Sequence, residues 1–239
     1  MNYPLIRCAS YGLRWLTCDT REAYVPIETV RDQIFYHINS TANASKHDLM
    51  RRGNIIDVGR ESNPFFGFYE TWQRSYSVRN KKTDTTEAVP PIQFLRRVKD
   101  KDITLDDPNI LPQLSLEIGR HFMMLARELV WEAVRLNEFP EAPSRQRCIW
   151  LTRTVEQARE WAPRMNIDLK LQPQTYWIVS LRATGKAFEA DGNFLAGDAE
   201  LLPVWHEKAR QYWLGEKSAS PQTEVLFNGT VEVVDIIGA

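Results

Sequence analysis

The stretch QTEVLFNGTVEVVDII, residues 222–237, decides the fold class that we expect. β-branched and apolar residues dominate it, and Asn228-Gly229 in its middle is a strong two-residue signal of a hairpin turn. The stretch therefore predicts two antiparallel strands, Thr223–Phe227 and Thr230–Ile237. Because side chains alternate along a strand, Gln222 and Glu224 are expected to point to the same side.

Three further strands and three helices are predicted from the rest of the chain. The strands, rich in β-branched and aromatic residues, are Gln33–Asn39, Arg147–Thr152 and Tyr176–Leu181. The helices are a long one between Asp107-Pro108 and Pro140, a short one that Thr154 and Gln157 open as a capping box and that ends near Pro163, and Pro203–Leu214. Helices in the first and middle parts and antiparallel strands towards the end are typical of an α+β fold.

The long helix is predicted from apolar residues that recur at steps of three and four, as on the apolar face of an amphipathic helix. These residues are Leu114, Ile118, Phe122, Leu125, Leu129, Ala133 and Leu136.

Four other segments carry weaker signals. Residues 1–20 indicate a small β-hairpin, and Lys46–Arg52 a short helix that Gly53 stops. Asn54–Glu70, with Gly59, Pro64 and Gly67 among its aromatic residues, is expected to be a structured loop. Residues 79–91 hold almost no apolar side chains and predict an exposed, mobile connection.

Composition bounds the class of protein. With 239 residues, of which 43% are hydrophobic, the chain suits a single domain over residues 1–239. The net charge of -1 gives no overall basic field for nucleic acid, and three cysteines without C-x-x-C spacing argue against a disulfide framework or a zinc ribbon. The absence of a signal-peptide core or a membrane-length apolar run favours a soluble, cytoplasmic protein without a membrane partner.

Several kinds of chemistry lack their sequence patterns. The four histidines show no metal-binding spacing, so no metal is expected, and the chain has no glycine-rich phosphate loop and no G-x-S-x-G nucleophile motif. Glycoside hydrolysis by a carboxylate pair, Glu224 with Glu232 or Asp235, stays formally open.

Three segments, in this order along the chain, carry a resemblance to a known family. They are Phe35–Asn39 (FYHIN), Arg127–Thr152 (RELVWEAVRLNEFPEAPSRQRCIWLT) and Gln222-Thr223-Glu224. Together they resemble the ADP-ribosyltransferase superfamily, and the middle one is similar to a largely uncharacterised bacterial family that we associate with it. The segment Val78–Asp107 matches nothing that we can name. The resemblance implies a split antiparallel β-sheet core with flanking helices.

The resemblance also implies an activity: transfer of ADP-ribose from NAD⁺, a substrate rather than a bound cofactor, to a protein or nucleic-acid acceptor. Glu224 would be the catalytic carboxylate, because cleavage of the bond between nicotinamide and ribose gives an oxocarbenium-like transition state that a fixed negative charge stabilises. Gln222 would orient the acceptor, and His37 would hold a ribose hydroxyl. A core histidine is the ordinary alternative for His37.

The same resemblance suggests where the dinucleotide would lie. Arg145, which follows Ser144 in the Pro-Ser-Arg segment, would bind the pyrophosphate, or else form an ordinary salt bridge. The aromatic segment with Phe65 and Phe66 would close over nicotinamide, or else be core.

The middle residue of the catalytic set departs from the family pattern. The histidine branch places Tyr on the second strand and the arginine branch a Ser-Thr-Ser-like motif, whereas this chain has Trp150, Thr152 and Thr154. Trp150 would stack on nicotinamide and Thr152 would bind a ribose, unless Trp150 is core and Thr154 only a helix cap.

Two other functions remain open at this point: a non-catalytic binding protein on the same fold, and an NAD glycohydrolase. Because small bacterial relatives are often toxins or effectors, the resemblance also suggests a toxin-antitoxin or phage-defence role, with an antitoxin or chaperone as partner. The acceptor and the oligomeric state do not follow from the sequence.

Overall fold

A curved antiparallel sheet forms the body of the protein in a computed structural model that describes residues 26–40, 50–71, 75–80, 83–103, 109–164, 176–197 and 200–237. Its strands are β1 (Ile27–Ser40), β2 (Ile55–Val58), β5 (Ile149–Leu151), β6 (Tyr176–Asp191) and β7 (Thr223–Ile237). A separate hairpin is formed by β3 (Tyr76–Arg79) and β4 (Thr86–Val89). The helices are α1 (Pro64–Glu70), α2 (Pro91–Lys99), α3 (Ile110–Glu138), α4 (Val155–Arg164) and α5 (Leu202–Trp213), with the short 3-10 helix η1 (Gly192–Leu195).

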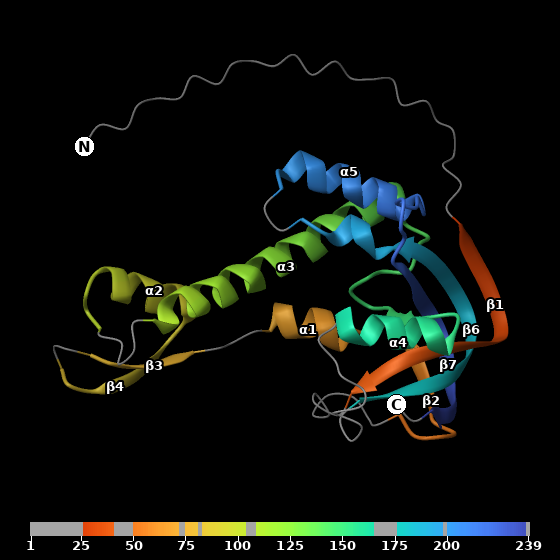
Figure 1. Ribbon diagram of the computed structural model, residues 1–239, viewed down its shortest axis with the longest axis horizontal. Helices are drawn as coiled ribbons and strands as arrows, with labels where there is room; N and C mark the ends of the chain where they lie inside the picture. The colour runs from red at the N-terminus through yellow and green to blue at the C-terminus, as the bar shows by residue number, and fades with distance from the viewer. Residues whose placement is uncertain are drawn as a thin grey trace, which may run out of the picture.

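The two long strands β6 and β7 pair along almost their whole length, and β1 pairs with the outer edge of β6. On its other edge β7 pairs first with β5 and then with β2. Backbone hydrogen bonds between Tyr36 and Thr152, 2.8 and 2.9 Å long, connect β1 to the end of β5. The sheet therefore curls until its first strand meets β5 (Figure 1).

The prediction of a hairpin turn at Asn228-Gly229 is wrong, because β7 continues through these two residues as one strand. Asn228 pairs with Lys186, and Gly229 pairs with Gly185. A Cβ on Gly229 would lie 2.5 Å from the carbonyl oxygen of Thr184, and the φ of Gly229 is 144°. This glycine thus permits a close approach of two backbones, at the point where β7 changes its neighbour from β5 to β2.

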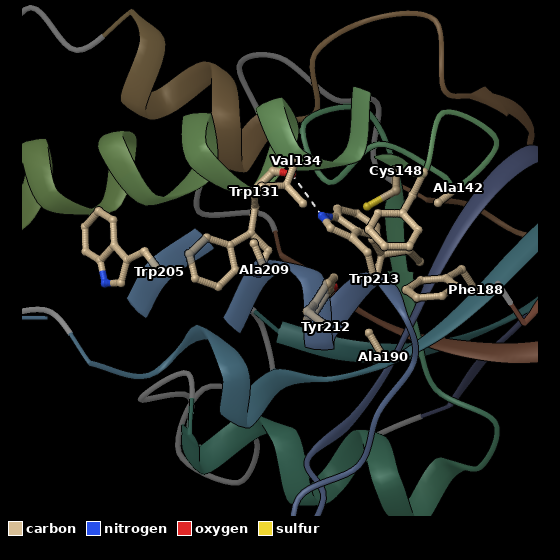
Figure 2. Close-up of a cluster of buried hydrophobic side chains, with 12 residues drawn as sticks. Trp131, Val134, Ala142, Cys148, Phe188, Ala190, Trp205, Ala209, Tyr212 and Trp213 are labelled. Carbon is tan, nitrogen blue, oxygen red and sulfur yellow. Dashed lines mark hydrogen bonds between the residues drawn. The ribbon is translucent and has the colours of Figure 1, made fainter. Parts of the chain in front are cut away.

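Two helices, α3 and α5, lie side by side over one face of the sheet (Figure 1). Large aromatic side chains fill the space between them and the sheet, among them Trp131, Phe188, Tyr212 and Trp213 (Figure 2). The indole Nε1 of Trp213 donates a 2.9 Å hydrogen bond to the carbonyl of Trp131, which ties α5 to α3. A second, smaller cluster joins α4 to Tyr36, Ile38 and Ile178.

The long helix is confirmed, but its apolar stripe is only partly in the core. Ile118 is buried, whereas Phe122, Leu129 and Leu136 are 45%, 51% and 59% exposed. The residues that α3 buries further along include Glu128, Trp131 and Arg135. Glu128 and Arg135 can be buried on this face because their charged groups are hydrogen-bonded, which offsets the loss of water.

The sequence predicted an exposed, mobile connection over residues 79–91, but this segment contains regular secondary structure. It contributes to the β3–β4 hairpin, which lies with α2 at the end of α3 remote from the sheet (Figure 1). A small core of Val78, Val89, Phe94 and Ile103 holds this unit. Few apolar residues suffice because the alternation of the two strands puts Val78 and Val89 on one side, under α2.

The remaining local predictions had mixed outcomes. Strands near 33–39, 147–152 and 176–181 are confirmed, although β1 and β6 are longer, and both predicted short helices are present as α4 and α5. The structured loop over 54–70 is instead β2 and α1, and Met50–Arg52 is not helical. Residues 46–49 and the hairpin expected over 1–20 lie outside the described residues. The observed mixture of helices and antiparallel strands agrees with the α+β class. None of the described helices is both long and apolar enough to cross a membrane.

Candidate functional site

Glu224 lies at the start of β7, where its side chain is 9% exposed. One carboxylate oxygen, Oε1, accepts two hydrogen bonds: 2.5 Å from Arg145 Nη1 and 2.6 Å from Tyr212 Oη. The other oxygen, Oε2, has no hydrogen-bond partner among the described residues, and it is not one of their fully enclosed polar atoms. Within the described residues, the protein therefore holds this carboxylate by one oxygen only.

Arg145 is the centre of a buried charge cluster. Its Nε and Nη2 donate to the two oxygens of Glu128 at 3.0 and 3.4 Å, and its Nη1 donates to Tyr212 Oη at 2.7 Å as well as to Glu224. Its guanidinium also lies against the rings of Trp150 and Tyr212, 5.5 and 5.2 Å from their centroids. The salt bridge that the sequence left open is thus present, and the donors meant for pyrophosphate are occupied by protein groups.

Mutual attraction keeps Arg145 and Glu128 ionised despite burial. Burial by itself lowers the pKa of Arg145, but the carboxylates of Glu128 and Glu224 outweigh it and raise that pKa well above its usual value. For Glu128, burial raises the pKa, and Arg145 and Arg127 together bring it below the ordinary value. Burial raises the pKa of Tyr212 well above its usual range, so its hydroxyl keeps the proton that it donates to Glu224.

The Cys148 thiol beside this cluster is buried. Burial raises the pKa of its thiol well above the ordinary value, which leaves the thiol protonated.

Aromatic side chains from α1 border the cluster. Trp150 packs edge-on against Phe65 with 5.5 Å between ring centroids, and both are half-buried. Phe66 is buried, in agreement with the core alternative. Asn63 positions α1: its side chain caps the helix at the backbone N–H of Phe66 and donates to the carbonyls of Arg145 and Cys148.

Beyond the Tyr36–Thr152 bridge the backbones of β1 and β5 do not pair, and we call this unpaired stretch the opening. There the carbonyl of Trp150 accepts a 2.8 Å hydrogen bond from His37 Nδ1 instead of from the backbone of β1. Because hydrogen bonding alternates along a strand, the N–H and C=O of Ile38 point towards this opening. Neither group has a partner within the described parts of the chain. The opening thus offers one backbone donor and one acceptor.

His37 stays neutral in this arrangement. Burial lowers the pKa of His37, and its hydrogen bond with Trp150 offsets this only in part. A carbonyl can only accept, so Nδ1 carries the hydrogen and Nε2 is an acceptor. Phe35, two residues earlier, belongs to the core cluster of Val225, whereas Leu226 belongs to the α3–α5 cluster. His37 and Glu224 therefore project from opposite faces of the sheet.

Tyr36 and Thr152 share the face of Glu224. The register of β5 and β7, continued by one step, puts Thr152 beside Glu224, and Thr152 is itself bridged to Tyr36. The hydroxyl of Thr152 donates 2.9 Å to the carbonyl of Thr154, so towards a ligand it can act only as an acceptor. Tyr36 is a neighbour of the site that the sequence did not single out.

Gln222 lies outside β7, beside a shallow hollow of about 80 Å³ lined by Gln157, Glu160, Trp161, Pro221, Gln222 and Thr223. Its backbone N–H donates to Asp191 Oδ1 at 2.8 Å, and Trp161 Nε1 donates to the carbonyl of Thr223 at 2.8 Å. Asp191 also accepts from the backbone of Ser218 and Asn193. Buried Asp191 thus fixes the segment that leads into Glu224.

Ser144 lies beside the cluster. Its hydroxyl donates 3.0 Å to Glu132 Oε2 and accepts from the backbone N–H of Gln146. This supports the turn before Arg145 rather than an open binding surface.

Sequence reasoning missed Tyr212, Asn63 and Asp191, and it quoted Glu128 without a role. Only Glu128 left a signal in the sequence, because it is an acidic residue three positions after Leu125 of the apolar stripe. The other three act through partners that are distant in sequence.

Comparison with known proteins places the chain in a family. Residues 35–239 match the family described as "Protein of unknown function (DUF2441)", so the chain belongs to that family. No curated protein matches the chain.

Proposed function

We propose that this member of the DUF2441 family transfers ADP-ribose from NAD⁺ to an acceptor, with Glu224 as the catalytic carboxylate. The observation that carries the proposal is a carboxylate held at Oε1 by two donors, with Oε2 unbonded among the described residues and close to the place where β1 and β5 stop pairing. A preorganised negative charge of this kind stabilises a positive transition state without reorganisation at the moment of reaction.

In the proposed reaction, the bond between ribose C1′ and the nicotinamide nitrogen breaks, and the electron pair leaves with neutral nicotinamide. Positive charge then spreads over C1′ and the ring oxygen of the ribose. Oε2 of Glu224 accepts a hydrogen bond from the ribose 2′-hydroxyl and stabilises this charge. A lone pair of the acceptor forms the new bond to C1′, and the acceptor's proton is released to solvent.

The opening between β1 and β5 suits the leaving group. The carboxamide of nicotinamide has one carbonyl acceptor and an N–H donor, which complement the N–H and C=O of Ile38. Trp150 and Phe65 border the same region and supply aromatic surface. A sheet that separates beside its catalytic carboxylate also supports the finer fold proposal, an ADP-ribosyltransferase-like split core.

The other site residues take different roles in this proposal. Gln222, beside the hollow at α4, would contact the acceptor. Arg145 would orient Glu224 rather than bind pyrophosphate, because each of its three guanidinium nitrogens already donates to a protein group. His37 would hold the Trp150 carbonyl and so keep β5 in place next to the opening. A ribose contact from His37 remains a prediction.

The proposal is tested with purified protein, labelled NAD⁺ and a cell lysate separated into protein, DNA and RNA. We expect wild-type protein to release nicotinamide and label one fraction, and Glu224→Gln to lose about 10²-fold or more of this turnover. Glu232→Gln is the matched control, because Glu232 lies on the same strand in an exposed pair with Arg182 and should retain turnover.

Each contrary outcome has a distinct meaning. Equal turnover by wild type and Glu224→Gln would remove Glu224 from the mechanism. Nicotinamide release without label in any fraction would indicate an NAD glycohydrolase. Intact NAD⁺ after long incubation with folded wild-type protein would contradict the enzyme proposal and favour a binding protein.

A further inference from the structure

We infer that Tyr212 is a positioning residue, which acts with Arg145 to fix the rotation of the Glu224 carboxylate so that Oε2, and only Oε2, meets the ribose. The inference rests on the proposed function and deepens it. Tyr212 comes from α5, and neither its spacing nor its sequence context suggested a part in the site.

The geometry of three atoms carries this inference. Tyr212 Oη donates to Glu224 Oε1 at 2.6 Å and accepts from Arg145 Nη1 at 2.7 Å, while the same Nη1 donates to the same Oε1. The hydroxyl, the guanidinium nitrogen and the carboxylate oxygen thus form a closed triangle of hydrogen bonds. Two of the three bonds end on Oε1, and the third joins their donors to each other.

Two donors on one oxygen matter because the last torsion of a glutamate is soft, with a broad distribution. With Arg145 alone, the carboxylate can turn towards a bidentate pair in which the guanidinium engages both oxygens. Such a pair would occupy Oε2 and withdraw it from substrate. The hydroxyl of Tyr212 disfavours this arrangement, because its own hydrogen bond to Glu224 forms when Oε1 accepts from both Tyr212 and Arg145.

The ring of Tyr212 is rigid enough to impose this choice. It is fully buried, packs edge-on against Trp213 with 4.8 Å between centroids, and lies tilted against Phe188 with 6.2 Å between centroids. Burial also keeps its hydroxyl protonated at neutral pH, so that the donor to Glu224 is permanent.

Tyr212→Phe isolates this role, because it removes one oxygen atom and leaves the ring in the core. Trp213→Phe is the matched control: Trp213 is the next residue, is equally buried and loses its own hydrogen bond to the Trp131 carbonyl. A purely structural loss in this core should affect both variants alike.

The experiment measures kcat and KM for NAD⁺ consumption, with thermal unfolding of each variant. We expect Tyr212→Phe to lower kcat about 10- to 100-fold, the loss for one hydrogen bond to a charged group, with KM unchanged. Trp213→Phe should keep its kcat at temperatures where it is folded. In a Glu224→Gln background, Tyr212→Phe should cause no further loss, because the two residues act as one unit.

The positioning role alone would be overturned by a wild-type kcat in Tyr212→Phe. It would also be overturned by an equal loss of kcat from Tyr212→Phe with and without the Glu224→Gln substitution. A kcat loss in Trp213→Phe that matches Tyr212→Phe would attribute the effect to the core and would also overturn it. Absence of NAD⁺ turnover by wild-type protein would instead overturn the proposed function, and this inference with it.

Discussion

Two arginine–carboxylate pairs in this protein have similar hydrogen bonds and very different surroundings. On the β3–β4 hairpin, Arg79 binds both oxygens of Asp84 at 2.6 and 2.9 Å, with both side chains more than 70% exposed. In the buried cluster between α3 and the start of β7, Arg145 binds Glu128 and Glu224 with its side chain 4% exposed. The distance between nitrogen and oxygen alone therefore does not distinguish an exposed ion pair from a buried one on which a site depends.

The difference lies in what each pair would face without its partner. Water solvates either member of the exposed pair, so breaking it exchanges one favourable interaction for another. The buried carboxylates have no water to replace Arg145, and an unpaired buried charge is costly. The same confinement fixes Glu224 in direction, which a catalytic carboxylate requires and a solvated one lacks.

The largest effect that this comparison predicts is the loss of Arg145. Arg145→Met keeps much of the volume but leaves Glu224 buried without its cation and Glu128 with Arg127 alone, so the free energy of unfolding should fall by about 3–5 kcal/mol. Chemical denaturation monitored by tryptophan fluorescence measures this change. A loss below about 1 kcal/mol would show that the cluster is not buried in solution as described.

A smaller effect concerns pH and His37. Because the folded pKa of His37 lies below its ordinary value of 6.5, the unfolded chain takes up the proton more readily. Its contribution to stability is therefore complete above that value and declines as the pH falls below it. The free energy of unfolding should decrease from about pH 7.5 to about pH 5.5, and less steeply in His37→Gln, which keeps a donor for the Trp150 carbonyl.

His121, whose pKa burial also lowers, titrates in the same range and remains in both proteins. The comparison between wild type and His37→Gln therefore isolates His37. Identical slopes in the two proteins would place the imidazole of His37 in solvent.

The smallest effect is expected at the exposed pair. Arg79→Met should leave the unfolding midpoint and NAD⁺ turnover unchanged, because water replaces the lost partner of Asp84. Differential scanning calorimetry at low salt, where surface pairs are strongest, is the most demanding check. A clear drop in the midpoint would remove the contrast with Arg145.

Local chemistry made parts of the molecule predictable. The capping pair was found from sequence, and the structure shows the backbone N–H of Gln157 bonded to Thr154 Oγ1, while Gln157 reaches back to the N–H of Arg153. The strand around Glu224 was likewise found from its alternation. Both depend on residues within a few positions of one another, where spacing is informative.

Prediction failed where the partner of a residue is remote in the chain. Asn228-Gly229 has the composition of a turn, but its backbone pairs with β6 and, at Gly229, also with β2, and this pairing outweighs a local preference. The polar segment 79–91 became a hairpin because α2 covers it. Neither influence is visible in a local window of sequence.

The sequence by itself determined the main helices and strands, the α+β class and the choice of Glu224 as the residue most worth testing. Only the tertiary structure decided that Arg145 pairs with Glu224 and Glu128, that Tyr212 completes the cluster, and that His37 and Glu224 lie on opposite faces of the sheet. The physical reason is the range of the interactions. Periodicity and capping act over a few residues, whereas the charge cluster joins positions 128, 145, 212 and 224, which meet only when the sheet curls beneath α3 and α5.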